Sequence, residues 1–131
     1  MVELLVVATI IIVISTIGVV SFRNAGVASR DGKRKADLET VRQALVIYRS
    51  EGTQYPGGGY DGMIETLNAD GYISNPVPQD PGSNSYHYGP RGANNTGFCL
   101  CAQLEDTSAG NSSDNNCTFS GTTHYCLENP N

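Results

Sequence analysis

Four cysteines carry the clearest chemistry in this chain: Cys99, Cys101, Cys117 and Cys126. An even number in a small domain behind an apolar segment is typical of two disulfide bonds formed in an oxidising compartment. The set lacks the C-x2-C pair of common zinc sites, so we favour disulfides over a metal. A bridge between Cys99 and Cys101, which share one face of a predicted strand, would strain the short loop. Each is therefore expected to pair with Cys117 or Cys126, in an order that the sequence leaves open.

The other reactive residues form no catalytic pattern. His87 and His124 have no partner at ligand spacing, so we expect them on the surface or on strands. The acids and amides of loop 106–116 lack the D-x-D-x-D-G spacing of a calcium loop, which favours a solvated loop. We find no nucleophile–base pair, phosphate-cradling glycine loop or paired carboxylates. We therefore expect neither an enzyme nor a bound cofactor or metal.

Three asparagines begin an N-x-S/T pattern: Asn94, Asn111 and Asn116. This pattern is an acceptor for glycosylation on exposed loops, although chance matches are common in a chain rich in Asn and Ser. We keep the three as candidate sugar sites.

Glu3 stands at the edge of an uncharged apolar run from Leu4 to Val20, which is 17 residues long. As a helix this run spans roughly 25 Å, just enough for a bilayer core if flanking residues help. A secretory signal peptide would have a basic start and a small-residue cleavage site, and neither is present. We therefore interpret the run as an anchor. A charge at the edge of a membrane span is costly and usually has a function.

A second helical pattern follows the anchor. Between Ala28 and Tyr48 there is no proline, and apolar residues recur at helical spacing on one face: Leu38, Val41, Ala44, Leu45 and Tyr48. Single glycines are the only weak points between this segment and the anchor. The sequence therefore predicts one rod of about fifty residues, on the order of 75 Å long, that is apolar in its first half and amphipathic in its second.

A basic cluster lies at the start of the amphipathic half and comprises Arg30, Lys33, Arg34 and Lys35. It is a candidate contact for anionic lipid headgroups or for acids of a neighbouring subunit, and the alternative is a solvated helix face. The formal net charge of -5 argues against nucleic acid as an obligatory partner.

The remaining residues predict a small head. Met63, Ile64 and Leu67 indicate a short helix, and alternating apolar positions indicate strands at 85–89, 97–105 and 117–119 with 124–127. We expect an α+β fold in which an antiparallel sheet of three or four strands packs on the amphipathic half of the rod. The predicted parts are an apolar helix half (1–22), an amphipathic half (23–52) and a head (53–131).

The first seven residues, with an acid before an unbroken aliphatic helix, resemble the N-terminal signature of type IV pilins and type II secretion pseudopilins. The helix 28–48 with Tyr55-Pro56, and the turn Asp80-Pro81-Gly82 with Tyr86, extend this resemblance over roughly the first 88 residues. The tail from Gly89 matches no family that we can name. The family's glutamate is the fifth mature residue and here it is the third, so the chain is expected to lack two leading residues or to begin at an internal methionine.

The resemblance implies a subunit that waits in the inner membrane, is processed by a prepilin peptidase and is polymerised by a pilus assembly machinery. Its assembly residues would be Glu3, Leu4, Leu5, Val6 and Val7, with Glu3 paired to the N-terminal amine of a neighbouring identical subunit. Pilins commonly carry a proline in the anchor near the position of Val20. In its absence, Gly18 is the expected soft spot of the helix.

Three functions are compatible with this pattern. We favour the major subunit of a type IV pilus, an extracellular filament at the bacterial cell surface for adhesion, motility or DNA uptake. The second is a pseudopilin of a type II secretion system, but pseudopilins of that kind often hold calcium near the C-terminus and seldom need two disulfides. The third is a monomeric membrane-anchored binding domain. A minor pilin is also compatible with every feature above.

Overall fold

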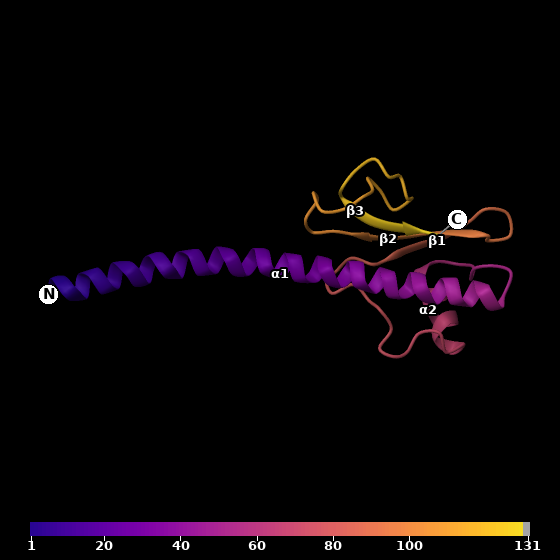
Figure 1. Cartoon of the computed structure of the whole chain (residues 1–131), viewed down its shortest axis with the longest axis horizontal. Coiled ribbons are helices and arrows are strands. Elements are labelled where there is room, and N and C mark those ends of the chain that lie inside the picture. Colours follow the sequence, from indigo (N-terminus) through magenta and orange to yellow (C-terminus); the bar gives the residue numbers. More distant parts are fainter. Residues whose placement is uncertain (130–131) are drawn as a thin grey trace.

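The computed structural model describes residues 1–129, so residues 130–131 of the predicted head lie outside the described residues. One continuous helix, α1 (Val2–Glu51), runs the length of the molecule with its N-terminus far from the head (Figure 1). Its 50 residues correspond to about 75 Å. The helix ends where the backbone of Gly52 becomes extended, and the Gly52 N–H donates to the carbonyl of Tyr48 at 3.1 Å. The predicted single rod is confirmed.

The head consists of a short helix and a three-stranded sheet. Helix α2 (Tyr60–Ala69) comes first, followed by β1 (His87–Arg91), β2 (Gly97–Gln103) and β3 (His124–Glu128). All neighbours are antiparallel and the order is β1-β2-β3. In Figure 1 the sheet lies on one side of the C-terminal half of α1 and α2 lies on the other. This arrangement confirms the α+β class.

The hydrophobic core lies between α1, α2 and one face of the sheet. Leu38, Val41 and Leu45 of α1 are fully buried because the helical repeat places them on one stripe. Phe98 of β2 is also fully buried, and its ring lies edge-on to that of Tyr55 with centroids 4.9 Å apart. The tyrosines contribute to this core: Tyr55, Tyr86 and Tyr88 are buried in it, and Tyr48, Tyr60, Tyr72 and Tyr125 pack against it.

Two predicted strand positions were wrong. The first strand begins at His87 rather than at residue 85 and includes Pro90, which is tolerated because β1 is an edge of the sheet. Residues 117–119 form no strand, since Cys117 takes a left-handed backbone conformation with φ of 52°. The predicted strand at 124–127 corresponds closely to β3.

β2 is more buried than its alternating pattern predicted. Phe98, Leu100 and Ala102 point into the main core as expected, but Cys99 and Cys101 on the opposite face are buried as well. They are covered because the chain between β2 and β3 folds back over the sheet, where Ser112 forms an isolated bridge with His124. The head is therefore thicker than a single sheet on a helix.

Candidate functional site

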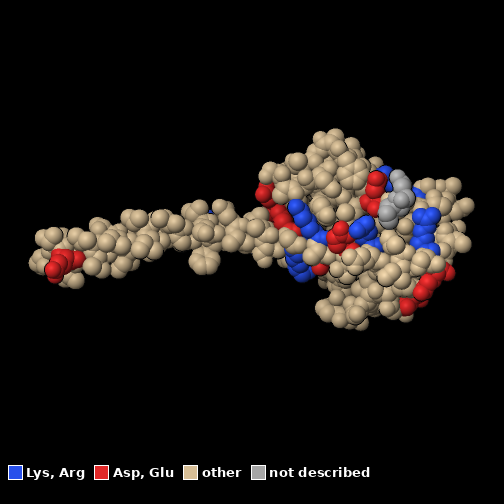
Figure 2. All heavy atoms as spheres, in the orientation of Figure 1, with Lys and Arg blue, Asp and Glu red and all other residues tan. Residues whose placement is uncertain are grey.

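The N-terminal half of α1 is a bare apolar rod. Fourteen large hydrophobic side chains between Val2 and Phe22 are exposed, with Leu4 at 72% and Ile14 at 64%. They lie all around the helix, and in Figure 2 this part projects from the head as an uncharged arm with acidic atoms only at its tip. α1 is the one helix among the described residues that is long and apolar enough to cross a membrane, by length and composition.

This exposure has a large energetic consequence. Moving a Val, Leu, Ile or Phe side chain out of water contributes about 1.5–3 kcal/mol, so the fourteen together represent on the order of 20–40 kcal/mol. A segment of this kind is stable only in lipid or against other apolar helices. The rod is therefore a surface for contact with something outside the chain.

The predicted assembly residues lie at the free end of the rod. Glu3 is in the first turn of α1, where a negative charge is favourable to the helix dipole. It takes part in none of the salt bridges found between described residues. Leu4, Leu5, Val6 and Val7 are between 51% and 72% exposed. Gly18 is half-buried, and α1 continues through it as a helix.

Arg34 is the center of a buried ion network at the junction of the rod and the head. Its side chain is 1% exposed, and Nε and Nη2 donate to the two carboxylate oxygens of Asp80 at 2.7 and 3.0 Å. Nη1 donates to Asp31 at 2.7 Å and to Glu105 at 2.9 Å. One guanidinium thus joins α1, the loop before β1 and the chain that leaves β2. The bond to the Asp80 carboxylate is the main cause of the raised pKa of Arg34.

The acids of this network are held in their charged form. Burial opposes ionisation of Asp31, but the backbone N–H groups of Asp106 and Glu105, together with Arg34, outweigh it and lower the pKa of Asp31. Hydrogen bonds from Arg30 and then Arg34 lower the pKa of Glu105 to about 2. Asp31 and Glu105 therefore stay ionised at neutral pH.

The basic cluster, a candidate contact for lipid headgroups or a neighbouring subunit with a solvated helix face as the alternative, is largely used within the chain. Arg34 is buried, so it belongs to no solvated face. Arg30 forms a bidentate pair with Glu105 at 2.6–2.7 Å, and Lys33 binds Asp37 at 2.8 Å and the Gln79 carbonyl. Lys35 donates to the Ala109 carbonyl at 2.8 Å and lies over the ring of Tyr125. Sequence reasoning had no means of finding these partners because most are more than 45 positions away.

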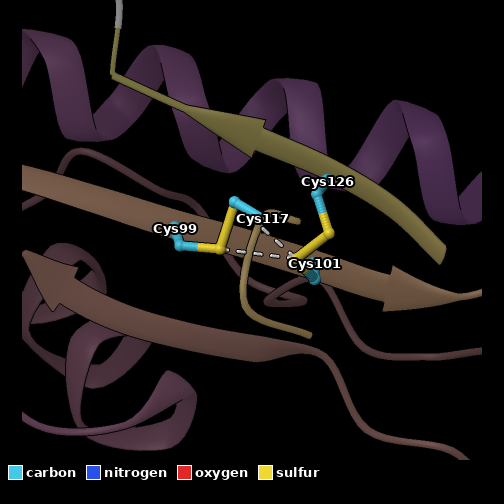
Figure 3. Close-up of side chains that lie close together, drawn as sticks. All are labelled: Cys99, Cys101, Cys117 and Cys126. Atoms are coloured by element: carbon cyan, nitrogen blue, oxygen red, sulfur yellow. Dashed lines mark hydrogen bonds between the residues drawn. A yellow bond between two sulfur atoms is a disulfide. The ribbon is translucent and has the colours of Figure 1, made fainter. Parts of the chain in front are cut away.

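The four cysteines form the two predicted disulfides. Cys99 is bonded to Cys117 and Cys101 to Cys126, which resolves the pairing that the sequence left open. Figure 3 shows the two bridges side by side, with Cys99 and Cys101 on β2 and Cys126 on β3. The first bridge ties the loop at Cys117 to β2, and the second joins the neighbouring strands β2 and β3 on the outer face of the sheet. Of the histidines, His87 begins β1 and His124 begins β3, as expected for strand residues.

The candidate sugar sites differ in their surroundings. Asn94 is exposed in a left-handed turn, and Asn116 is exposed while its side-chain oxygen accepts from Arg91 at 2.9 Å. Asn111 is exposed as well, and its side-chain nitrogen donates to the carbonyl of Cys126 while its side-chain oxygen accepts from the N–H of the same residue. All three are therefore accessible, and the side chain of Asn111 is the one held by two hydrogen bonds to the backbone of Cys126.

A helix with a bare apolar half and an amphipathic half under a small sheet is the architecture that the N-terminal residues led us to expect. A family model described as type II secretion system (T2SS), protein G, matches residues 22–119, which is well over half of the chain. The chain belongs to this protein G family. Comparisons with the curated proteins and with the solved structures gave no match.

The protein G family consists of pilin-like, pseudopilin subunits of filaments and is not an enzyme family. The match covers the amphipathic half of α1 and most of the head, and it begins at the last residue of the predicted apolar part, Phe22. The family and the exposed apolar helix together indicate a membrane-anchored subunit of a surface or periplasmic filament.

Proposed function

We propose that the chain is the major subunit of a type IV pilus that polymerises through the apolar half of α1. The observation that carries the proposal is the rod of fourteen exposed hydrophobic side chains, which no other described part of the chain covers. In the inner membrane, lipid would solvate this rod. In the filament, the rods of identical subunits would pack in a central core, where van der Waals contacts replace lipid contacts.

Glu3 gives this packing its axial register. A carboxylate in an apolar core is heavily penalised unless it is paired, so only arrangements that bring a cation to Glu3 are stable. The partner is the N-terminal amine of a neighbouring subunit, and Leu4, Leu5, Val6 and Val7 pack around the pair. Head-to-tail contacts of this kind do not close a ring, so they generate a helical filament. A prepilin peptidase and a pilus assembly machinery are the enzymatic partners that such a subunit requires.

Two observations bear on which filament it is. The paired disulfides favour an exposed extracellular pilus, because pseudopilins of type II secretion seldom need two disulfides. The protein G match favours the second candidate, a pseudopilin whose short periplasmic filament drives type II secretion. The third candidate, an anchored monomer, leaves the apolar rod in lipid throughout.

The test is a comparison of sheared filaments from cells that make the parent chain, Glu3→Gln or Glu65→Gln. Glu65 is an exposed acid on α2 and serves as the matched control. We expect filaments from the parent and the control, and at least tenfold fewer from Glu3→Gln (about 1.4 kcal/mol or more of lost assembly energy) at equal membrane levels of subunit. Equal filament yields from all three strains would refute the role of Glu3.

The length and origin of the filaments separate the candidates. Long filaments at native expression support the pilus. The pseudopilus would be supported instead if short filaments appeared only on overproduction and if deletion of the gene caused secreted proteins to be retained in the cell. Absence of filaments in every strain, with the subunit confined to membranes, would favour the anchored monomer.

A further inference from the structure

The two disulfides lie so close together that their four sulfurs form one cluster. All four Sγ atoms are within 4.8 Å of one another, and this is the one group of three or more Cys, His, Asp or Glu ligand atoms found at such spacing among residues 1–129. The dashed lines in Figure 3 join the sulfur of Cys101 to those of Cys99, at 3.5 Å, and Cys117, at 3.9 Å. When the two disulfides are reduced, four thiols in this arrangement are suited to bind a metal ion.

We propose that the reduced head binds one Zn²⁺ ion through the thiolates of Cys99, Cys101, Cys117 and Cys126. In a tetrahedral zinc site with Zn–S bonds of about 2.3 Å, the sulfurs lie ~3.8 Å apart. The two contacts between the bridges already have nearly this spacing. Only the two bonded pairs must separate, and rotation of the cysteine side chains between rotamers provides that movement.

The backbone holds three of the four ligands without help from the disulfides. Cys99 and Cys101 project from the same face of β2, and Cys126 lies directly opposite Cys101 in the β2–β3 ladder. The side chain of Asn111 fixes the strand at Cys126, since it accepts from the N–H of Cys126 at 2.7 Å and donates to its carbonyl at 2.9 Å. The reduced chain therefore keeps these ligands in place.

The fourth ligand is held by a polar loop. Asp114 accepts hydrogen bonds from the N–H groups of Asn116 and Thr118, on either side of Cys117, at 2.9 and 3.2 Å. The four cysteines are between 0% and 8% exposed, so water and competing ligands have little access. Arg91 donates to the carbonyl and the side-chain oxygen of Asn116, the residue before Cys117.

The choice of ion follows from the ligands. Four thiolates at tetrahedral spacing select Zn²⁺ among the common divalent cations, whereas calcium and magnesium require oxygen ligands. Zinc and the disulfides are alternative states of one site. In the reduced state, zinc would join the tail to the sheet at the same four positions that the disulfides join after oxidation. This inference does not depend on which filament the subunit forms.

The test uses the full chain in detergent micelles after anaerobic reduction by a water-soluble phosphine. For each disulfide, one phosphine becomes the phosphine oxide with an oxygen atom from water, and two thiols form. Zinc alone is then added, and binding is followed by competition with a chromophoric chelator. We expect one zinc ion per reduced chain, none per oxidised chain, release of the thiol protons, and four sulfur neighbours at about 2.3 Å in X-ray absorption.

Two variants make the assignment specific. Cys117→Ser should weaken zinc binding by at least about tenfold, because it removes a ligand. Loss of a group that only orients a ligand already lowers metal affinity by about 10–100-fold. His124→Ala removes the histidine of β3, which pairs with Gln103 and not with a cysteine, and should leave the affinity unchanged. Zinc should also raise the melting temperature of the reduced parent and not of the oxidised parent. Equal binding by oxidised and reduced chains, fewer than four sulfur neighbours, or a reduced chain that zinc neither binds nor stabilises would overturn the proposal.

Discussion

Arg34 shows how much of this fold depends on single residues. Its guanidinium is 1% exposed and is surrounded by the carboxylates of Asp31, Asp80 and Glu105. The bidentate geometry with Asp80 is specific to arginine, since lysine has no planar fork of donors. Because the three acids come from α1, the loop before β1 and the exit of β2, the arginine fixes the position of the head on the rod.

Replacing Arg34 by Met should destabilise the head by about 3–5 kcal/mol, since it leaves buried carboxylates without a partner. The matched control is Arg42→Met, which breaks the half-exposed surface pair with Glu39 and should cost no more than about 1 kcal/mol. Urea unfolding of both variants, followed by tyrosine fluorescence, provides the measurement. Equal losses in the two variants would show that the network contributes no more than a surface ion pair.

Acid should weaken the same contacts. The folded-state pKa values of Asp31 and Glu105 are lowered, the latter to about 2, so their stabilising effect is complete above the unfolded values near 4. It is lost as the pH falls through the folded values. We therefore predict that the melting temperature drops between about pH 4.5 and about pH 2. The double variant Asp31→Asn/Glu105→Gln should have a lower melting temperature than the parent at neutral pH. Its melting temperature should also fall less steeply between about pH 4.5 and about pH 2. An unchanged slope would contradict the assignment.

At the scale of elements, β2 is the central strand of the head and is buried on both faces. One face supplies Phe98, Leu100 and Ala102 to the core against α1, and the other supplies Cys99 and Cys101 to the disulfides. The strand therefore joins two layers that have different chemistry. Disulfides are needed on the outer side because the chain that covers it, residues 104–123, contains no regular helix or strand.

Removal of one bridge should weaken this outer layer. The double change Cys101→Ala with Cys126→Ala opens a loop of 25 residues and should lower the free energy of unfolding by about 2–4 kcal/mol. Circular dichroism should show the same α1 helix content as the parent, because the core stripe of α1 does not touch the bridges. If the variant had the same melting temperature as the parent, that result would count against a stabilising role. So would a parent chain whose melting temperature is the same in reducing and oxidising buffer.

At the scale of the whole molecule, the chain has two halves suited to different surroundings. The head buries its apolar residues internally, whereas the rod between Val2 and Phe22 leaves them outside. Such a subunit is complete only when lipid or other rods cover that surface. Charges gather where the rod meets the head and are nearly absent from the arm itself (Figure 2). This division supports the proposal that the arm is the assembly element and the head the exposed one.

The sequence predicted the features that depend on local periodicity. The apolar stripe of α1, the alternation in β2 and the even number of cysteines each led to the observed element or bond. The pairing of the cysteines and the burial of Arg34 could not be predicted from the sequence. Asp80 and Glu105 lie 46 and 71 positions from Arg34, and only the folded chain brings them together. Cys117 was misassigned to a strand because a left-handed residue has no signature in an alternating pattern.

The central claim is that the apolar arm forms the core of a filament of identical subunits. Cryo-electron microscopy of filaments sheared from cells that make the parent chain tests it most directly. We predict a helical reconstruction in which residues 2–22 pack around the axis, Glu3 lies against the N-terminus of a neighbour, and the disulfide-bonded sheets face solvent. A reconstruction with the heads at the axis and the arms outside, or with a different protein as the repeating subunit, would contradict it.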